Sequence, residues 1–303
     1  MSVADFVEDS FGSNSRKKLE NIRTGGSNNE KGNKYESYFA VAKICSAISN
    51  SLAHKNFDNY SVSAQEEAFI DDLCYKVHDL NEKTNYQAKN SSGSAAAWTK
   101  EIADRCQYQR EIDLIYHGAT SSKNVLLVSS KARYKKNLKK IPQEMRTYCF
   151  CEHFPYIENS SSLIAAYKPL RDDLTTICAN SNLQTLDTAF KILLSVWATS
   201  SHKAHRTVGD IVGEAKRMSH PNLFCALLPE REVPNWLMEK CATFNDCYAS
   251  VESGIVCVNY NGLKISVLNV TDIDINKQKI LQKETTVDAF LQSLTNFAKQ
   301  SLA

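Results

Sequence analysis

The spacing of apolar residues predicts a chain that alternates between helices and strands. Apolar side chains recur at helical spacing from Tyr35 to Ser51 and again from Trp98 to Ile115, so both segments are expected to be helices. Between them, residues 61–75 and 85–89 have the composition of two strands joined by a polar turn. The continuous apolar run from Asn124 to Ser129 predicts a buried strand. The first half therefore has the predicted order helix, hairpin, helix, strand.

The second half of the chain predicts helices followed by a β-hairpin. An amphipathic helix is expected from Leu183 to Trp197, and shorter helices at 207–218 and 233–243. Asn261-Gly262 separates two apolar runs and is the strongest short-range hairpin signal in the sequence. Together these elements predict a mainly α, winged-helix-like unit, which a helical tail at 287–303 follows.

Shifts in composition divide the chain into four segments. Residues 1–33 are rich in Ser, Asn, Gly and charge and are expected to form a flexible arm, with a capped helix that leads into the first element as the alternative. The predicted α/β domain spans 34–160, a Ser-rich break predicts a linker at 161–182, and the winged-helix-like domain takes up 183–303. The helix at 236–240 would read DNA in such a domain, but its apolar sequence favours packing against protein at least as strongly.

The overall composition is that of a globular protein. Of its 303 residues 43% are hydrophobic and 23% are charged, so a sizeable core can form. No apolar run is long enough to cross a bilayer and the N-terminus carries no apolar leader, which favours a soluble, cytoplasmic protein without membrane contact. The 10 cysteines lie largely in apolar runs and are expected to be reduced and buried. Because 36 Lys and Arg nearly balance 34 Asp and Glu, nucleic-acid affinity would need a local basic patch.

Candidate chemistry is concentrated between residues 36 and 89. Residues i and i+2 of a strand share a face, so Gln87 and Lys89 project together, and the preceding hairpin strand can place Asp72 beside them. Mg²⁺, or Mn²⁺ in its place, takes oxygen ligands; Asp72 would be the main carboxylate and the Gln87 carbonyl oxygen a second ligand. Lys89 would position or help deprotonate the attacking water, or offset transition-state charge, and Glu36 would bind a second metal or a metal-bound water.

The segments GNKYESYFAVAKI, AFIDDLCYKV and NYQAKNS resemble, in this order, the PD-(D/E)xK (restriction-endonuclease-like) nuclease superfamily. The likeness is greatest to the QxK-type double-stranded-DNA nuclease domains of bacterial anti-phage (CBASS-like) effectors, and it covers roughly residues 25–150. It implies an αβββαβ core, divalent-metal-dependent cleavage of DNA, and a partner such as a defence-system ATPase or sensor, or a second copy of the chain. By position, the family's functional residues correspond to Glu36, Asp72, Gln87 and Lys89.

The chain departs from the family pattern at the aspartate motif. The proline that usually precedes the aspartate is absent, and the pair Asp71-Asp72 leaves the metal ligand open by one residue. Asp72 is preferred because Leu73 then follows it in the family's usual pattern, whereas a register slip would select Asp71. Glu66 and Glu67 would enter the site if the strand began earlier.

A basic run lies after the last predicted strand of the first half. A solvated helix face is the usual reason for such a run, but a nuclease must also hold phosphates, and these side chains are candidates for DNA contact. The candidate residues are Lys131, Arg133, Lys135, Lys136, Lys139 and Lys140.

Each of these motifs also has a structural interpretation. The acidic pair can be edge charge on a strand, and Gln87 with Lys89 can be a solvated strand face. Cys149-x-Cys151-x-His153 has zinc-ligand residue types but not the spacing of a structural zinc site. Two other functions therefore stay open beside the DNA endonuclease: a non-catalytic DNA-binding or assembly protein with a degenerate nuclease fold, and an RNA-cleaving toxin.

Overall fold

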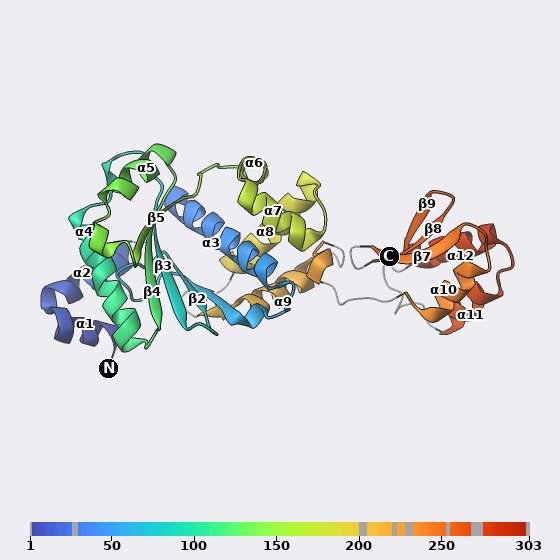
Figure 1. The fold of residues 1–303 in the computed structure, drawn as a ribbon, viewed down its shortest axis with the longest axis horizontal. Coiled ribbons are helices and arrows are strands. Elements are labelled where there is room, and N and C mark those ends of the chain that lie inside the picture. The colour runs from blue at the N-terminus through green and yellow to red at the C-terminus, as the bar shows by residue number, and fades with distance from the viewer. Residues whose placement is uncertain are drawn as a thin grey trace. The chain divides into compact units, whose positions relative to one another are not determined.

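The computed structural model divides the chain into two compact units (Figure 1). The first comprises residues 1–176 and 180–219, and the second comprises 177–179 and 220–303. The structure describes residues 2–25, 30–199, 205–219, 223–227, 233–252, 255–267 and 275–300. Among these residues, no helix combines the length and the apolar character that crossing a membrane requires.

The first unit is built on a mixed six-stranded sheet with the strand order β5-β4-β3-β2-β1-β6. Strands β1, β2 and β3 form an antiparallel meander, β3, β4 and β5 run parallel, and β6 pairs antiparallel with β1. The expected mixed α/β class is confirmed. The strands are β1 (Tyr60–Ser63), β2 (Leu73–Val77), β3 (Glu82–Lys89), β4 (Ser121–Val128), β5 (Cys149–His153) and β6 (Arg206–Thr207).

Helices cover both faces of this sheet. Helix α3 (Glu30–Ser51) packs on one face, where the Phe39 ring lies 4.8 Å from that of Tyr86. Helix α4 (Lys100–Glu111) continues into a π-helical turn at Ile112–Tyr116 and packs on the other face. There Ile102 and the β4 residue Leu126 share a core cluster. Single 3₁₀ turns lie at Phe57–Asn59, Ser94–Ala96, Gln143–Met145 and Cys225–Leu227.

The prediction of a flexible arm at 1–33 is wrong, and the described residues agree with the alternative of a capped helix. Helices α1 (Val3–Phe11) and α2 (Ser13–Gly25) precede α3, and the Ser2 hydroxyl caps α1 by accepting the Asp5 N–H at 3.1 Å. Val7 and Leu19 are buried and pack with Phe69 and Ile112. The Ser, Asn, Gly and charged residues of the segment as a whole outweigh a small periodic set of apolar residues, Phe6, Val7 and Leu19, that packs against Phe69 and Ile112.

The prediction of one strand over 61–75 is also wrong. The chain forms β1, leaves the sheet at Ala64 and re-enters it as β2 at Leu73. The intervening loop is closed by the Gln65 N–H, which donates to the Asp71 carbonyl at 2.7 Å. Asp71 and Asp72 therefore lie at the entrance to β2 and not within it.

The predicted linker and C-terminal domain have the wrong boundaries. Residues 161–182 contain α6 (Ser160–Ala166) and α7 (Lys168–Cys178), and α8 (Leu183–Ala198) packs on α3. The Phe190 ring of α8 meets the Tyr38 ring of α3 edge-on at 5.3 Å. The first unit extends through α9 (Val208–Met218), whose N-cap Thr207 accepts the Asp210 N–H at 3.1 Å.

The second unit is not built as the winged-helix prediction requires. Two of the three helices assigned to that fold, α8 and α9, belong to the first unit. The second unit contains α10 (Asn235–Ala242), an antiparallel sheet of β7 (Cys247–Glu252), β8 (Ile255–Tyr260) and β9 (Leu263–Val267), then α11 (Ile275–Lys283) and α12 (Val287–Gln300). Leu237 of α10 is buried with Phe290, which favours a packing role for this helix. The hairpin at Asn261-Gly262 is confirmed, with φ of +46° and +81°.

The packing of the N-terminal helices is tested by Leu19→Ala. Leu19 is 1% exposed, so the truncation is expected to lower the free energy of unfolding of the first unit by about 2 to 4 kcal/mol. Denaturant titration followed by circular dichroism measures this change. Lys17→Ala, on the exposed face of the same helix, is the control, and equal stability of the two variants would contradict the packing of α2 on the sheet unit.

Candidate functional site

A polar cavity opens at the end of the sheet where β2 begins and β3 ends. It has a volume of about 470 Å³, and the start of α3 and helix α4 contribute to its wall. A second cavity of about 170 Å³ shares Glu36 and Asp72 with it and extends to Trp197 on α8. The larger cavity brings together all of the residues predicted from the sequence as catalytic or metal-binding: Glu36, Asp71, Asp72, Gln87 and Lys89.

Asp72 is fixed at the mouth of β2 by two donors from β3. Its Oδ2 accepts the backbone N–H of Ala88 at 2.6 Å and the side-chain amide of Gln87. The antiparallel register explains this contact, because Leu73 pairs with Tyr86 and the next positions therefore bring Asp72 to Gln87. Burial raises the pKa of Asp72, while Lys89 and these hydrogen bonds oppose the rise.

Arg105 of α4 sets the orientation of the Gln87 amide. Its guanidinium Nη2 donates to the Gln87 Oε1, and its Nε donates to the Phe69 carbonyl at 2.7 Å. With an arginine donor on one side and a carboxylate on the other, the reversed amide would lose both hydrogen bonds. The Gln87 carbonyl oxygen therefore faces Arg105 and its nitrogen faces Asp72. This geometry makes Gln87 a positioning residue for Asp72, unlike the predicted metal ligand.

Three carboxyl groups, those of Glu36, Asp71 and Asp72, line the same cavity and shift one another's pKa values. Burial and the neighbouring Asp72 raise the pKa of Glu36 to about 8 and that of Asp71 to about 7. Lys89 opposes the shift at Glu36, and Arg105, whose Nη2 is 3.7 Å from Asp71 Oδ1, opposes it at Asp71. Such clustering of raised carboxyl pKa values is typical of functional sites.

The donor set fits a hard divalent cation. Asp71 Oδ1 is buried and has no hydrogen-bond partner, so the fold leaves one carboxylate oxygen unsatisfied in the cavity. Glu36 and Asp72 supply further carboxylate oxygens at the same cavity, and all three are the ligand type that Mg²⁺ and Mn²⁺ prefer. Both aspartates face the cavity, so Asp71 stands beside Asp72 as a potential ligand.

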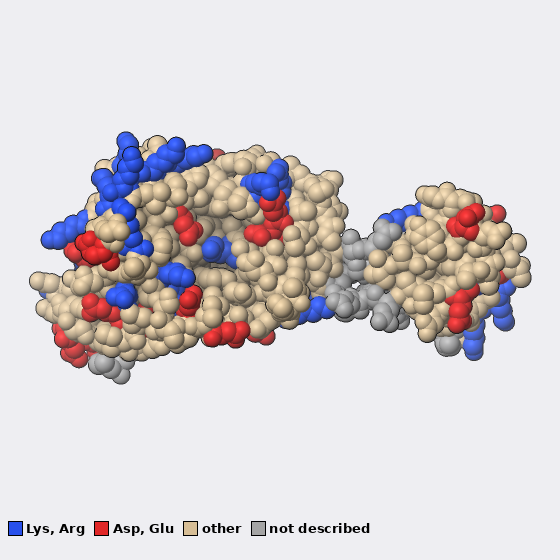
Figure 2. Space-filling view, in the orientation of Figure 1, with Lys and Arg blue, Asp and Glu red and all other residues tan. Residues whose placement is uncertain are grey.

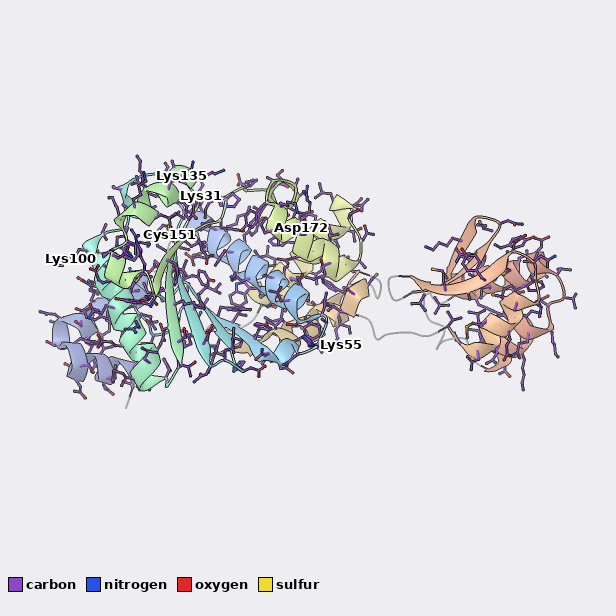
Figure 3. The ribbon with its side chains drawn as sticks, in the orientation of Figure 1. Lys31, Lys55, Lys100, Lys135, Cys151 and Asp172 are labelled. Atoms are coloured by element: carbon purple, nitrogen blue, oxygen red, sulfur yellow. The ribbon has the colours of Figure 1, made fainter. Side chains whose placement is uncertain are left out.

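The predicted basic run forms helix α5 (Lys131–Lys140), which packs beside the loop that follows β3. The buried Asn137 side chain accepts the Trp98 N–H and donates to the Ala96 carbonyl, each at 2.9 Å. Basic side chains gather over α5 in Figure 2, and Figure 3 labels Lys135 on this helix and Lys31 at the start of α3. The exposed lysines of α5 are Lys131, Lys135, Lys136, Lys139 and Lys140.

Arg133 differs from the other basic residues of α5. Its Nη2 donates to the Ser92 carbonyl at 2.9 Å, and its Nε is buried. The neighbouring Ser91 lines the cavity. Arg133 therefore anchors α5 to the rim of the cavity, which leaves its guanidinium less available for the predicted DNA contact than the exposed lysines of α5.

Arg105 is a site residue that was not predicted from the sequence. Its spacing relative to Trp98, Ile102 and Cys106 places it on the buried face of α4, where it is 6% exposed. A basic residue at an apolar position of an amphipathic helix is the signal that would have found it. Such a residue needs a buried acceptor, and the acidic pair before β2 was the available candidate.

The other residues that the sequence suggested as possible ligands do not line the larger cavity. Neither Glu66 nor Glu67 lines the larger cavity, and Glu66 instead contacts His205 and Lys83. Cys149 and Cys151 belong to the core cluster between α4 and the sheet, and they are not part of the candidate metal group found among the described residues.

Comparison with protein-family models, with curated proteins and with solved structures finds no match. The site is therefore interpreted from its own chemistry. Its components are a carboxylate cluster, a lysine at the end of β3 and a basic helix beside the cavity rim.

The raised carboxyl pKa values predict a pH dependence of stability in metal-free buffer. The folded state holds protons on Glu36 and Asp71 that the unfolded state has released, so the free energy of unfolding is expected to fall as pH rises from about 4 to about 8. Glu36→Gln should flatten the fall, as should added Mg²⁺, which favours the ionised carboxylates. Urea titrations across this pH range measure it, with the exposed Glu144→Gln as the control. Equal slopes for the two variants would contradict the assignment.

Proposed function

We propose that the first unit is a metal-dependent endonuclease that hydrolyses phosphodiester bonds of DNA with Mg²⁺ or Mn²⁺. The observation that carries the proposal is the single cavity that gathers Glu36, Asp71, Asp72 and Lys89 at the end of the sheet. Acidic oxygens for a hard cation beside a cation for phosphate are the groups that phosphodiester hydrolysis requires.

The order of elements supports the same proposal. From α3 the chain forms β1, β2 and β3, then α4 and β4, which is the helix, three strands, helix, strand order that the PD-(D/E)xK resemblance implies. The candidate residues also lie on the matching elements: Glu36 on α3, Asp72 at the entrance to β2, and Lys89 at the end of β3.

In this proposal the carboxylates of Asp72, Asp71 and Glu36 would hold the ion. A bound divalent ion supplies Lewis acidity toward the phosphate and lowers the pKa of water. Lys89 Nζ donates to the attacking water or to a phosphate oxygen and offsets the negative charge that grows in the transition state. Gln87 and Arg105 hold Asp72 and Asp71 in place, so their contribution is preorganisation of the ligands.

The exposed lysines of α5 would hold the DNA backbone beside the cavity. The hydrogen bonds of Asn137 and Arg133 fix this helix against the loop that follows Lys89, so phosphates bound along α5 lie next to the catalytic rim. These contacts carry charge but no base-reading geometry, which favours cleavage without strong sequence preference.

The sequence resemblance supports a role as an effector or subunit of a bacterial anti-phage system. In that setting a sensor or ATPase, or a second copy of the chain, would control the nuclease. The second unit, with its own core around Leu237 and Phe290, is the part of the chain proposed to bind such a partner.

Cleavage assays with Asp72→Asn and Lys89→Ala test the catalytic assignment. Each substitution is expected to lower the rate of Mg²⁺-dependent cleavage of plasmid and linear duplex DNA by at least about a hundredfold, because each removes a group that acts on the reacting phosphate. EDTA should abolish wild-type cleavage, and an RNA substrate tests the alternative specificity.

Asp172→Asn is the matched control for Asp72→Asn. Asp172 is exposed on α7, where it pairs with Lys168, and it is labelled in Figure 3. Wild-type activity in this variant, with loss in the other two, supports the site. Absence of DNA and RNA cleavage by the wild type, with or without cellular extract, would favour the non-catalytic DNA-binding or assembly function.

DNA binding by α5 predicts a measurable salt dependence. In EDTA, Lys135→Ala/Lys136→Ala is expected to weaken duplex binding and to reduce the slope of log K against log salt by about 0.9 for each phosphate that the helix no longer neutralises. Fluorescence anisotropy at several salt concentrations measures the slope. The control is Lys279→Ala/Lys283→Ala, an exposed pair in the second unit. An unchanged slope in the α5 variant would argue against this helix as the DNA surface.

A further inference from the structure

A second group of metal-ligand side chains lies away from the carboxylate cavity. Glu66 is in the loop between β1 and β2, Cys74 is on β2, and His205 immediately precedes β6. One ligand atom from each lies within 4.8 Å of the others. We propose that Glu66, Cys74 and His205 bind a divalent transition-metal ion of the zinc type. This site goes beyond the nuclease proposal and does not rest on it.

Strand pairing and hydrogen bonds bring the three side chains close to one another. Ser63 and Cys74 are register partners on the adjacent strands β1 and β2. The Ser63 hydroxyl donates to Glu66 Oε1 and lies 3.2 Å from His205 Nδ1, while His205 Nε2 lies 3.1 Å from Glu66 Oε1. Because these contacts bring the imidazole and the carboxylate beside the buried thiol, little rearrangement is needed to bind an ion.

The charge around the group favours a cation. Lys83 is 3% exposed, and its Nζ lies 3.1 Å from Asp113 Oδ1 and 3.7 Å from Glu66 Oε2. Two carboxylates therefore face the Lys83 ammonium. A divalent ion that displaces the Cys74 thiol proton would add only one net positive charge beside these carboxylates.

Asp113 cannot take the place of a ligand because its oxygens are already used. It accepts hydrogen bonds from Asn85 at 2.6 Å, Ser122 at 2.7 Å and Gln109 at 3.0 Å, in addition to its ion pair with Lys83. These bonds hold Lys83 on the Oε2 side of Glu66. The metal would bind Glu66 Oε1 on the side of His205, in place of the direct contact between this oxygen and His205 Nε2.

The ligand types distinguish this site from the carboxylate cavity. A thiolate, an imidazole and one carboxylate suit zinc, whereas Mg²⁺ prefers an all-oxygen set. Three protein ligands leave the fourth tetrahedral position for water. A bound ion would tie the segment before β6 to β2 across the intervening strand β1.

The experiment uses the full chain, stripped with chelator and reloaded with Zn²⁺ or Co²⁺. Elemental analysis after gel filtration measures bound zinc, and absorption spectroscopy detects the thiolate-to-cobalt charge-transfer band. The wild type is expected to bind one equivalent of zinc and to show the band. Cys74→Ala should lose the band, and His205→Gln should weaken zinc binding by more than about tenfold.

Two variants serve as matched controls. Cys151→Ala removes another buried cysteine of the same sheet, and Asp72→Asn disables the carboxylate cavity; both should retain zinc and the band. Retention in Asp72→Asn would show that the site is independent of the nuclease proposal. His205 is 41% exposed, so His205→Gln tests the site without opening the core.

The proposal is overturned by any of three results. The first is a wild type that retains no zinc, and the second is equal zinc binding by wild type, Cys74→Ala and His205→Gln. The third is loss of the band in Cys151→Ala with retention in Cys74→Ala, which would move the metal to the cysteines of β5.

Discussion

The first unit depends on how it satisfies a row of polar side chains buried between β3 and α4. Lys83, Asn85 and Gln87 alternate onto the face of β3 that α4 covers, and each is less than 5% exposed. Polar groups in that position destabilise the fold unless each finds a partner. The partners are supplied by Arg105 of α4 and by Asp113 of the π-helical turn that follows it. These pairs fix the position of α4 on the sheet more specifically than apolar contacts alone would.

The carboxylate cavity lies at one end of this row, and the same polar contacts fix the side chains that line it. Arg105 reaches the Gln87 amide, the Phe69 carbonyl and the Asp71 carboxylate from one side chain. The loop before β2 is therefore anchored to α4, and Asp72 is anchored to β3 through Gln87 and Ala88. The fold holds the acidic groups close together, and their mutual repulsion lowers the stability of the folded state. A bound cation relieves this repulsion, so the same arrangement raises the affinity of the site for a cation.

The sequence predicted which polar side chains come together at one cavity better than it predicted the boundaries of the elements and domains around them. Strand alternation and a short hairpin limit which side chains can meet, and this placed Asp72 beside Gln87 and Lys89 in the prediction; the same cavity also holds Glu36 of α3. Arg105 was not predicted as a site residue because its role comes from the packing of α4 on the sheet. The periodicity of one segment does not reveal such packing. The same reason explains why α8 and α9 were assigned to the wrong unit. Their apolar faces were recognised, but an apolar face does not identify the surface that covers it.

The short strand β6 has a consequence for how the first unit is completed during synthesis. It pairs with β1 through only Ser61↔Thr207 and Val62↔Arg206, yet it follows β1 by more than a hundred residues. Until residue 207 has emerged from the ribosome, β1 is an open sheet edge. Before Phe190 has emerged, the face of α3 that Phe190 contacts is uncovered. A nascent chain arrested near residue 182 would therefore expose both an unpaired strand and an apolar helix face to neighbouring chains. The unit closes on itself late, and translation speed through residues 183–219 sets how long that exposure lasts.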